Sequence, residues 1–162
     1  MMIHFESDYL EGCCPQILKA FENTNLEKTA GYGNDEYCKM AADLIKEACG
    51  CPGAEVYFLV GGTQTNATVI DSMLRSYQGV MCASTGHINV HEAGAIESGG
   101  HKIFGLPHKD GKLSSETVEA CLKAYRDDES RDHTVMPAMV YISQPTEYGT
   151  IYSLKELREI SR

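Results

Sequence analysis

Residues 55–66 read EVYFLVGGTQTN, and this stretch gives the strongest local indication of the fold class. Its first six residues form a compact run of β-branched and aromatic side chains, which is typical of a buried strand. Two glycines then allow a tight turn, and the polar residues after them lead into a helical pattern over residues 65–77. The stretch therefore predicts a buried strand, a turn and a helix in succession.

The segments before this stretch predict two helices. Residues 15–23 can form a short helix, with Pro15 in the first turn, where a missing N–H costs nothing. Residues 37–48 place their apolar side chains on one helical face. Asn34 or Asp35 can cap the start of this second helix, and Gly50 stands where a left-handed C-terminal cap belongs.

The segments after this stretch continue the alternation of strands and helices. Short apolar runs predict strands over residues 80–83, 102–106 and 138–144. Ser114 or Ser115 begins another helix, and Ser153 begins a last one, in which Glu156 completes a capping box. This alternation predicts an α/β fold with a mostly parallel sheet and flanking helices.

The composition limits the partners and the compartment. A formal net charge of −9, without a basic stripe, argues against a nucleic-acid partner. No segment approaches the roughly 18 apolar residues that a membrane span requires. The acidic N-terminal segment does not resemble a signal peptide, so we expect a cytoplasmic protein. The spacing of the seven cysteines is not that of a zinc site, and we expect free, mostly buried thiols.

The turn after the first expected strand is a candidate phosphate site. Glycines let the backbone approach a phosphate, and the first turn of the helix offers unpaired N–H groups and the positive end of the helix dipole. Thr63 or Thr65 could add a hydroxyl donor. The alternative is a plain tight turn with a threonine cap, and the six residues alone leave both possibilities open.

Residues 86–95, GHINVHEAGA, hold two histidines four residues apart. On a helix His87 and His91 could share one face and bind a metal, but nothing nearby suggests a third ligand and we expect no metal. The alternative is a structural role, which we also expect for His101, His108 and His133. Residues 143–150, SQPTEYGT, form a loop directly after an expected strand, where polar side chains could face a ligand.

Six segments in order resemble threonine aldolases and the related β-eliminating lyases. They are Ser7-Asp8 with Gly12, YGND at 32–35, GGTQTNA at 61–67, GHINVHEAGA at 86–95, DGKL at 110–113 and QPTEYGTIYSLKEL at 144–157. Those enzymes depend on pyridoxal 5′-phosphate and have the fold of aspartate aminotransferase, known as fold type I. The resemblance implies that residues 1–162 are the N-terminal part of the cofactor-binding large domain, with residues 1–14 as an arm. It also implies that the rest of the large domain and the small domain would be absent from this chain.

The resemblance also implies roles for individual residues. The phosphate would be held by Gly61, Gly62, Thr63 and Gln64, and His87 would stack on the pyridine ring. Glu92, beside the ring, is a further catalytic candidate, and so is Glu147, which stands where some aldolases have a histidine near the substrate hydroxyl. Ser7 and Asp8 would line the substrate side, and Tyr32 would approach the site of a neighbouring subunit.

The implied reaction is the cleavage of a β-hydroxy amino acid to glycine and an aldehyde, in a homo-oligomer of two or four subunits. β-Elimination by the same residues stays open, as does a non-catalytic role of the isolated chain in binding a phosphorylated ligand or a partner. None of the nine lysines lies in the family's cofactor-attachment motif, so the chain alone is expected to be inactive. Residues 55–60 would pair with a strand of the missing half, which predicts a chain that is unstable alone.

Overall fold

The structure is a computed structural model that describes His4, Ser7 and residues 9–162. The chain divides into two compact units, residues 1–58 and residues 59–162. The first unit contains two helices, α1 (Pro15–Thr24) and α2 (Glu36–Ala48). Neither helix has a buried residue, so the apolar face of each lies open in this chain.

The ends of α2 follow the local signals in the sequence. The side chain of Asp35 accepts a hydrogen bond of 2.9 Å from the backbone N–H of Cys38. At the other end, Gly50 has a φ of +63°, the left-handed region that glycine adopts without a steric cost. The N–H of Cys51 donates to the carbonyl oxygen of Lys46 across this turn. The predicted cap at Asp35 and the predicted stop at Gly50 are therefore confirmed.

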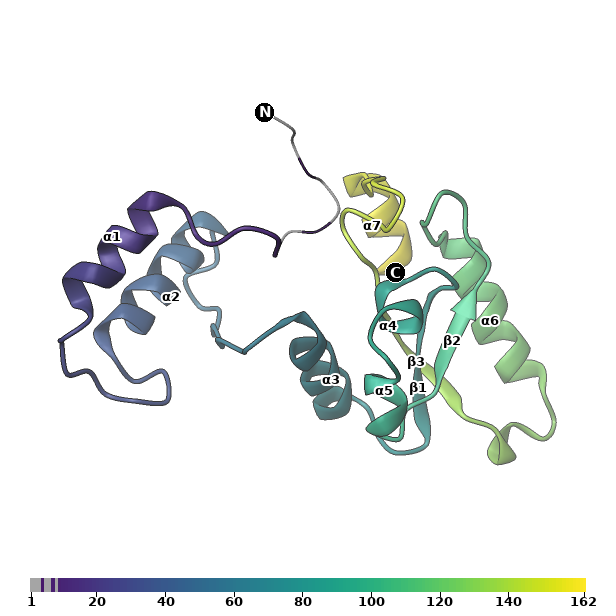
Figure 1. The fold of residues 1–162 in the computed structure, drawn as a ribbon. Coiled ribbons are helices and arrows are strands. Elements are labelled where there is room, and N and C mark those ends of the chain that lie inside the picture. The colour runs from purple at the N-terminus through teal and green to yellow at the C-terminus, as the bar shows by residue number, and fades with distance from the viewer. Residues whose placement is uncertain (1–3, 5–6, 8) are drawn as a thin grey trace. The chain divides into compact units, whose positions relative to one another are not determined.

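The second unit contains a three-stranded parallel sheet in the order β2-β1-β3. The strands are β1 (Gln78–Ala83), β2 (Ile103–Leu106) and β3 (Met136–Val140). The helices are α3 (Gly62–Met73), α4 (His87–Val90), α5 (Ala95–Ser98), α6 (Ser115–Asp127), the 3₁₀ helix η1 (Arg131–His133) and α7 (Leu154–Ile160). Helices flank the sheet (Figure 1), which confirms the predicted α/β fold.

The central strand β1 forms the middle of two hydrophobic clusters. Val80 and Cys82 pack on one face with side chains from α3, α4 and α5, namely Ile70, Ile88 and Ile96. Met81 and Ala83 pack on the other face with Leu113 and with Val118 of α6. Successive side chains of a strand point to opposite faces, so one strand supplies both clusters.

The predicted helix starts after the sheet are also confirmed. Ser114 caps α6 by accepting a hydrogen bond of 3.2 Å from the N–H of Thr117. At α7, the Ser153 hydroxyl accepts from the N–H of Glu156 at 3.3 Å, and the Glu156 carboxylate accepts from the N–H of Ser153 at 2.7 Å. These two bonds form the capping box that the sequence predicts.

Four expectations are wrong in this structure. The helix expected over residues 65–77 spans Gly62–Met73 instead. Residues 55–60 form no strand, because within the described chain no neighbouring strand pairs with them; Val60 is 95% exposed. The third sheet strand lies at residues 136–140, not 138–144, and it includes Pro137 beside a register shift at Gly79 and Val80. All seven cysteines are free, but only Cys82 is buried.

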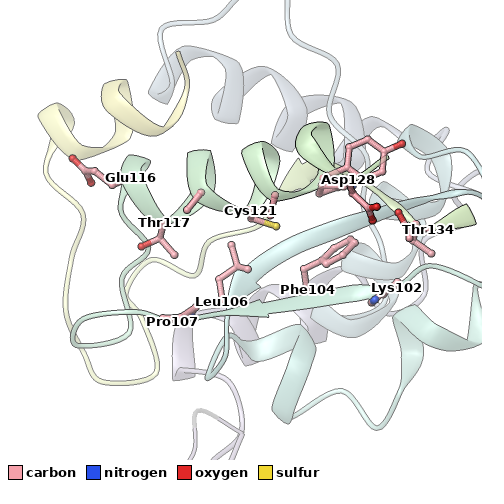
Figure 2. A pocket seen from close by; sticks show the side chains of 14 residues that line it. Lys102, Phe104, Leu106, Pro107, Glu116, Thr117, Cys121, Asp128 and Thr134 are labelled. Carbon is pink, nitrogen blue, oxygen red and sulfur yellow. The ribbon is translucent and has the colours of Figure 1, made fainter. Parts of the chain in front are cut away.

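Two general features complete the fold. No helix in the described part of the chain is long and apolar enough to cross a membrane. A mostly apolar groove of about 640 Å³ lies between α6 and the sheet, lined by Phe104, Leu106, Cys121 and Pro137 among others (Figure 2). This groove includes no catalytic or cofactor-binding residue proposed from the sequence.

Candidate functional site

The loops that follow β1 and β3 meet at the carboxyl edge of the sheet, where open α/β sheets bind their ligands. His87 begins α4, four residues after the end of β1, and Glu147 lies in the loop after β3. The Nδ1 atom of His87 is 3.8 Å from Oε1 of Glu147. The hydroxyl of Ser143 donates a hydrogen bond of 2.8 Å to that same oxygen. The structure thus brings together two residues that are 60 positions apart in the sequence.

The two side chains differ in exposure. Only 17% of the Glu147 side chain is exposed, whereas 49% of the His87 side chain is exposed. The carboxylate is therefore shielded and fixed by Ser143, while the imidazole keeps a surface on which a ligand could lie.

Glu92 is the most unusual residue of the site. It is 5% exposed, and Oε1 accepts a hydrogen bond of 2.7 Å from Nδ2 of Asn66. The other oxygen, Oε2, is buried and has no hydrogen-bond partner. Buried polar atoms are nearly always paired, so an unpaired carboxylate oxygen indicates a place for a donor from a ligand, a water or another segment.

Tyr141, directly after β3, lies near these two pairs. Burial raises the pKa of the Tyr141 hydroxyl, and the negative charges of Glu92 and Glu147 act in the same direction. Hydrogen bonds with the side chains of Ser143 and Asn66 oppose that rise in pKa. The Tyr141 phenol is therefore kept neutral, in surroundings that include the charges of Glu92 and Glu147.

Asn66, Tyr141 and Ser143 were not among the functional residues predicted from the sequence. Asn66 ends the GGTQTN segment and Ser143 begins the SQPTEYGT segment, so both lay within motifs that the sequence had singled out. Tyr141 lies within the strand expected at residues 138–144, and nothing in that pattern distinguished it from a core residue.

The turn before α3 has the geometry of an anion site. Gly61 is the N-cap of α3, and its carbonyl oxygen accepts hydrogen bonds from both the N–H and the hydroxyl of Thr65, at 3.0 and 2.9 Å. The side-chain oxygen of Gln64 accepts from the N–H of Val60 at 2.9 Å. The N–H groups of residues 62–64 are in the first helical turn, where no intrahelical acceptor exists. A Cβ placed on Gly61 or Gly62 would meet no atom within 4 Å, so the turn is open to a ligand.

The two histidines of α4 and its C-cap lie side by side. The rings of His87 and His91 are 5.2 Å apart between centroids and tilted by 44°. Among the residues that the structure describes, no group of three or more His, Cys, Asp and Glu side chains could hold a metal ion.

Ser7 and Tyr32, two of the predicted substrate-side residues, belong to the unit of residues 1–58. Ser7 accepts a hydrogen bond of 3.4 Å from the N–H of Tyr9 through its hydroxyl. Tyr32 is fully exposed and has a φ of +62°, a conformation that is uncommon for residues other than glycine. Asp8 lies outside the described residues. The roles of these three residues remain predictions.

Comparison with known proteins gives consistent matches along the chain. Residues 4–162 match the model of a family described as beta-eliminating lyase. A low specificity L-threonine aldolase of Pseudomonas sp. (strain NCIMB 10558) is 35% identical, and one of Pseudomonas aeruginosa is 31% identical. Each alignment covers 97% of this chain and 44% of the relative.

A solved structure of Leishmania major threonine aldolase matches with a TM-score of 0.89 and 44% identity, over 95% of this chain and 44% of that chain. The chain therefore spans less than half the length of the proteins that it matches, and it shares its α/β fold with part of that aldolase.

Proposed function

This chain belongs to the beta-eliminating lyase family, and on that basis we propose that the protein is a pyridoxal-phosphate-dependent lyase of the threonine aldolase type. It cleaves a β-hydroxy amino acid to glycine and an aldehyde. Aldol cleavage is favoured over β-elimination because both curated relatives and the solved structure carry the name threonine aldolase.

One structural observation supports the proposal most strongly. The open first turn of α3 is connected through Asn66, one turn further along that helix, to the buried carboxylate of Glu92, whose Oε2 lacks a partner. A helix start with unpaired N–H groups and an unpaired buried acceptor are thus linked by a single side chain. The arrangement suits a ligand that carries both a phosphate and a hydrogen-bond donor.

The residues present fit the family's cofactor. Gly61, Gly62, Thr63 and Gln64 would hold the phosphate through backbone N–H groups and the Thr63 hydroxyl. His87 would lie against the ring with its exposed face, and Glu92 would stand beside it. When bound, the cofactor supplies an electron sink for the carbon atom next to the substrate amine.

The chain's own side chains would handle the proton of the substrate hydroxyl. We assign its acceptance to the carboxylate of Glu147, one oxygen of which is fixed by Ser143 and faced by His87. A fixed, shielded carboxylate suits this step, because general-base catalysis requires a base held within hydrogen-bonding distance of the proton. Ser7, Asp8 and Tyr32 would contact the amino acid, and Tyr32 would do so in a neighbouring subunit of a dimer or tetramer.

The matched relatives are more than twice as long, so we also propose that a further segment or chain completes the site. It would supply the lysine that attaches the cofactor, since none of the lysines here lies in such a motif. The present chain would be the N-terminal part of the cofactor-binding large domain.

The activity is tested with the native protein that contains this chain. We expect acetaldehyde and glycine from L-threonine, and a borohydride-trapped cofactor on a lysine. Pyruvate released from L-cysteine or L-tyrosine, without aldehyde from L-threonine, would instead establish β-elimination. Absence of both products and of any trapped cofactor would exclude the lyase assignment.

The role of Glu147 is tested by Glu147→Gln, which keeps the shape of the side chain and removes the base. We expect kcat for L-threonine to fall by about 100-fold or more. Glu159→Gln, an exposed substitution on α7, is the matched control and should leave kcat unchanged. Equal activity of the two variants would remove Glu147 from the mechanism.

A further inference from the structure

His108 lies outside every motif used above, yet its ring is held on both sides. The N–H of Gly111 donates a hydrogen bond of 2.9 Å to Nδ1, and Nε2 lies 3.1 Å from the hydroxyl oxygen of Thr85. Because Nδ1 accepts, it carries no proton, and the proton of the neutral ring is on Nε2. The ring therefore accepts from the turn after β2 and donates to the loop after β1.

Thr85 is two residues before His87, so this bond fixes the segment from which α4 begins. The donor Gly111 belongs to a turn in which Lys109 and Lys112 pair through their backbones at 3.1 and 2.9 Å. One imidazole thus joins the end of β1 to the end of β2.

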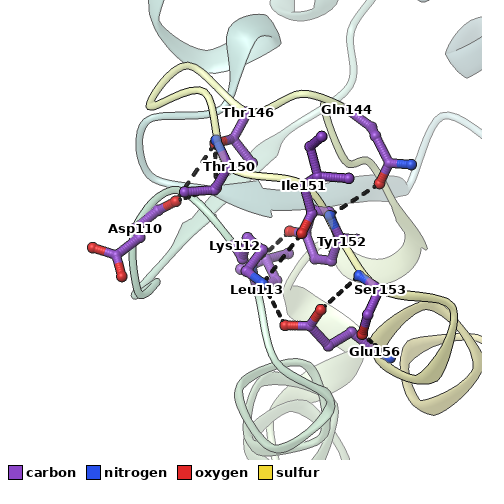
Figure 3. Close-up of polar contacts among 10 residues, drawn as sticks. All are labelled: Asp110, Lys112, Leu113, Gln144, Thr146, Thr150, Ile151, Tyr152, Ser153 and Glu156. Carbon is purple, nitrogen blue, oxygen red and sulfur yellow. Dashed lines mark hydrogen bonds and ion pairs between the residues drawn. The ribbon is translucent and has the colours of Figure 1, made fainter.

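The same turn is fastened to the loop that carries Glu147. The carbonyl oxygen of Asp110 accepts from the hydroxyl of Thr150 at 2.7 Å, and the N–H of Leu113 donates to the hydroxyl of Tyr152 at 2.7 Å (Figure 3). Lys112 donates to the carbonyl oxygen of Ile151 at 3.4 Å. The ring of His108 also lies 5.8 Å from that of Tyr148, the neighbour of Glu147.

Packing in this region leaves little freedom. A Cβ on Gly111 would come within 2.8 Å of Oγ1 of Thr146 and 2.9 Å of Cδ2 of Tyr148. The turn and the loop are therefore in direct van der Waals contact. A shift of the turn would move the loop that holds Glu147.

We propose that His108 is a positioning residue that sets the spacing between His87 and Glu147. Its Nε2-protonated ring connects Thr85, on the side of His87, to the turn at Gly111, which packs against the loop of Glu147. Its importance for catalysis rests on the proposed function, whereas its effect on the spacing does not.

The bonding is tested by nitrogen-15 NMR of the native protein that contains this chain, without any substitution. We expect an unprotonated Nδ1, a protonated Nε2 and a scalar coupling across the hydrogen bond between Gly111 N and His108 Nδ1. A protonated Nδ1, or a missing coupling, would overturn the proposal regardless of any enzymatic activity.

The positioning is tested with three variants of His108. Asn keeps an acceptor near the position of Nδ1, Gln keeps a donor near the position of Nε2, and Ala keeps neither. We expect His108→Ala to shift the amide resonances of both His87 and Glu147. His108→Asn should restore only the side of Gly111 and Glu147, and His108→Gln only the side of Thr85 and His87. His133→Gln, on the exposed η1 helix, is the control and should shift neither. Unchanged resonances of His87 and Glu147 in His108→Ala would contradict the proposal.

Catalysis is tested separately in the native protein. His108→Ala should lower kcat by about 10- to 100-fold, because small misplacements of reacting groups have effects of this order. In a Glu147→Gln background it should lower kcat by only about 2-fold, since the group that it positions is gone. If kcat of the double variant falls by the product of the two separate effects, His108 does not act through Glu147. If the native protein lacks lyase activity, the proposed function fails, and the NMR result alone decides whether His108 sets this spacing.

Discussion

At the scale of single residues, Glu92 keeps a buried carboxylate oxygen without a donor, which costs free energy until a ligand or another segment supplies one. Glu92→Gln removes the buried charge and retains an oxygen that can accept from Asn66. We expect the ligand-free chain to gain about 1–2 kcal/mol of unfolding free energy, because an unpaired neutral group is less costly than an unpaired charge. Chemical denaturation at neutral pH measures this difference.

Glu97→Gln, in the neighbouring helix α5, is the control for this prediction. Glu97 is exposed, so its substitution should change the unfolding free energy by less than about 0.5 kcal/mol. Loss of stability in Glu92→Gln would mean that the carboxylate already has a donor in the unliganded chain.

Gly111 and Gly100 allow the effect of crowding to be separated from that of backbone conformation. Both have left-handed backbones, with φ of +80° and +87°, but only a Cβ on Gly111 would meet neighbouring atoms. Gly100→Ala should cost about 1–2 kcal/mol for the conformation alone. Gly111→Ala should cost about 1–3 kcal/mol more, because it also overpacks the contact with Thr146 and Tyr148. Equal losses in urea unfolding would show that the turn and the loop are not in contact.

At the scale of elements, the start of α7 should make stability depend on pH. The hydrogen bond from the Lys112 ammonium lowers the pKa of the Glu156 carboxyl from 4.5 to about 2, and the N–H and hydroxyl of Ser153 add to this effect. A folded-state pKa below the unfolded value means that the stabilisation is complete above pH 4.5 and is lost as the pH falls toward about 2.

The test compares melting temperatures of the wild-type chain and Glu156→Gln across this range. The wild-type advantage should be constant above about pH 5 and should disappear near pH 2. Glu159→Gln on the same helix should show no such convergence with the wild type. A Glu156→Gln difference that is independent of pH would mean that the Lys112 contact does not influence Glu156.

The elements that the sequence predicts well are those with local causes. Asp35, Gly50 and the Ser153–Glu156 pair act within a few residues, so the printed sequence contains all the information that they need. The strand at residues 55–60 has a non-local cause, because a strand requires a neighbour with which to pair its backbone. The predicted bounds of β3 were wrong for a related reason. Pro137 fits a strand only where its missing N–H leaves no acceptor unpaired.

The candidate site likewise contains residues that can be identified from the sequence and residues that cannot. His87, Glu92, Glu147 and the turn at Gly61 and Gly62 were named from motifs, and the structure places His87 beside Glu147. Tyr141 and His108 were missed because their significance depends on residues far away in the sequence. The charge of Glu92, 49 positions away, acts on Tyr141, and His108 contacts Thr85, 23 positions away. Such partners are determined by the sheet topology and not by spacing along the chain.

At the scale of the whole molecule, the exposed apolar run should promote self-association. Phe58 and Val60 are exposed, and their backbones belong to no strand ladder. The double substitution Phe58→Ser and Val60→Ser should reduce the fraction of dimers and larger species in sedimentation velocity. It should change the unfolding free energy by less than about 1 kcal/mol, because little buried surface is lost.

Ile88→Ala is the control for this prediction, because it should affect stability and not association. Its side chain is 1% exposed in the cluster beneath α3, α4 and α5, so its loss should cost about 2–5 kcal/mol and leave association unchanged in the folded population. If the double serine variant associates as strongly as the wild type, another surface is responsible.

The burial of β1 on both faces has a consequence for the dynamics of this unit. The N–H of Val80 donates to the carbonyl oxygen of Lys102, directly before β2, and the side chain of Val80 is fully buried. For deuterium to reach that amide, β2 must separate from β1 while both covering layers loosen together. The slowest exchange in the second unit should therefore occur at Val80 and its neighbours in β1, and the rate there reports the opening of the entire unit.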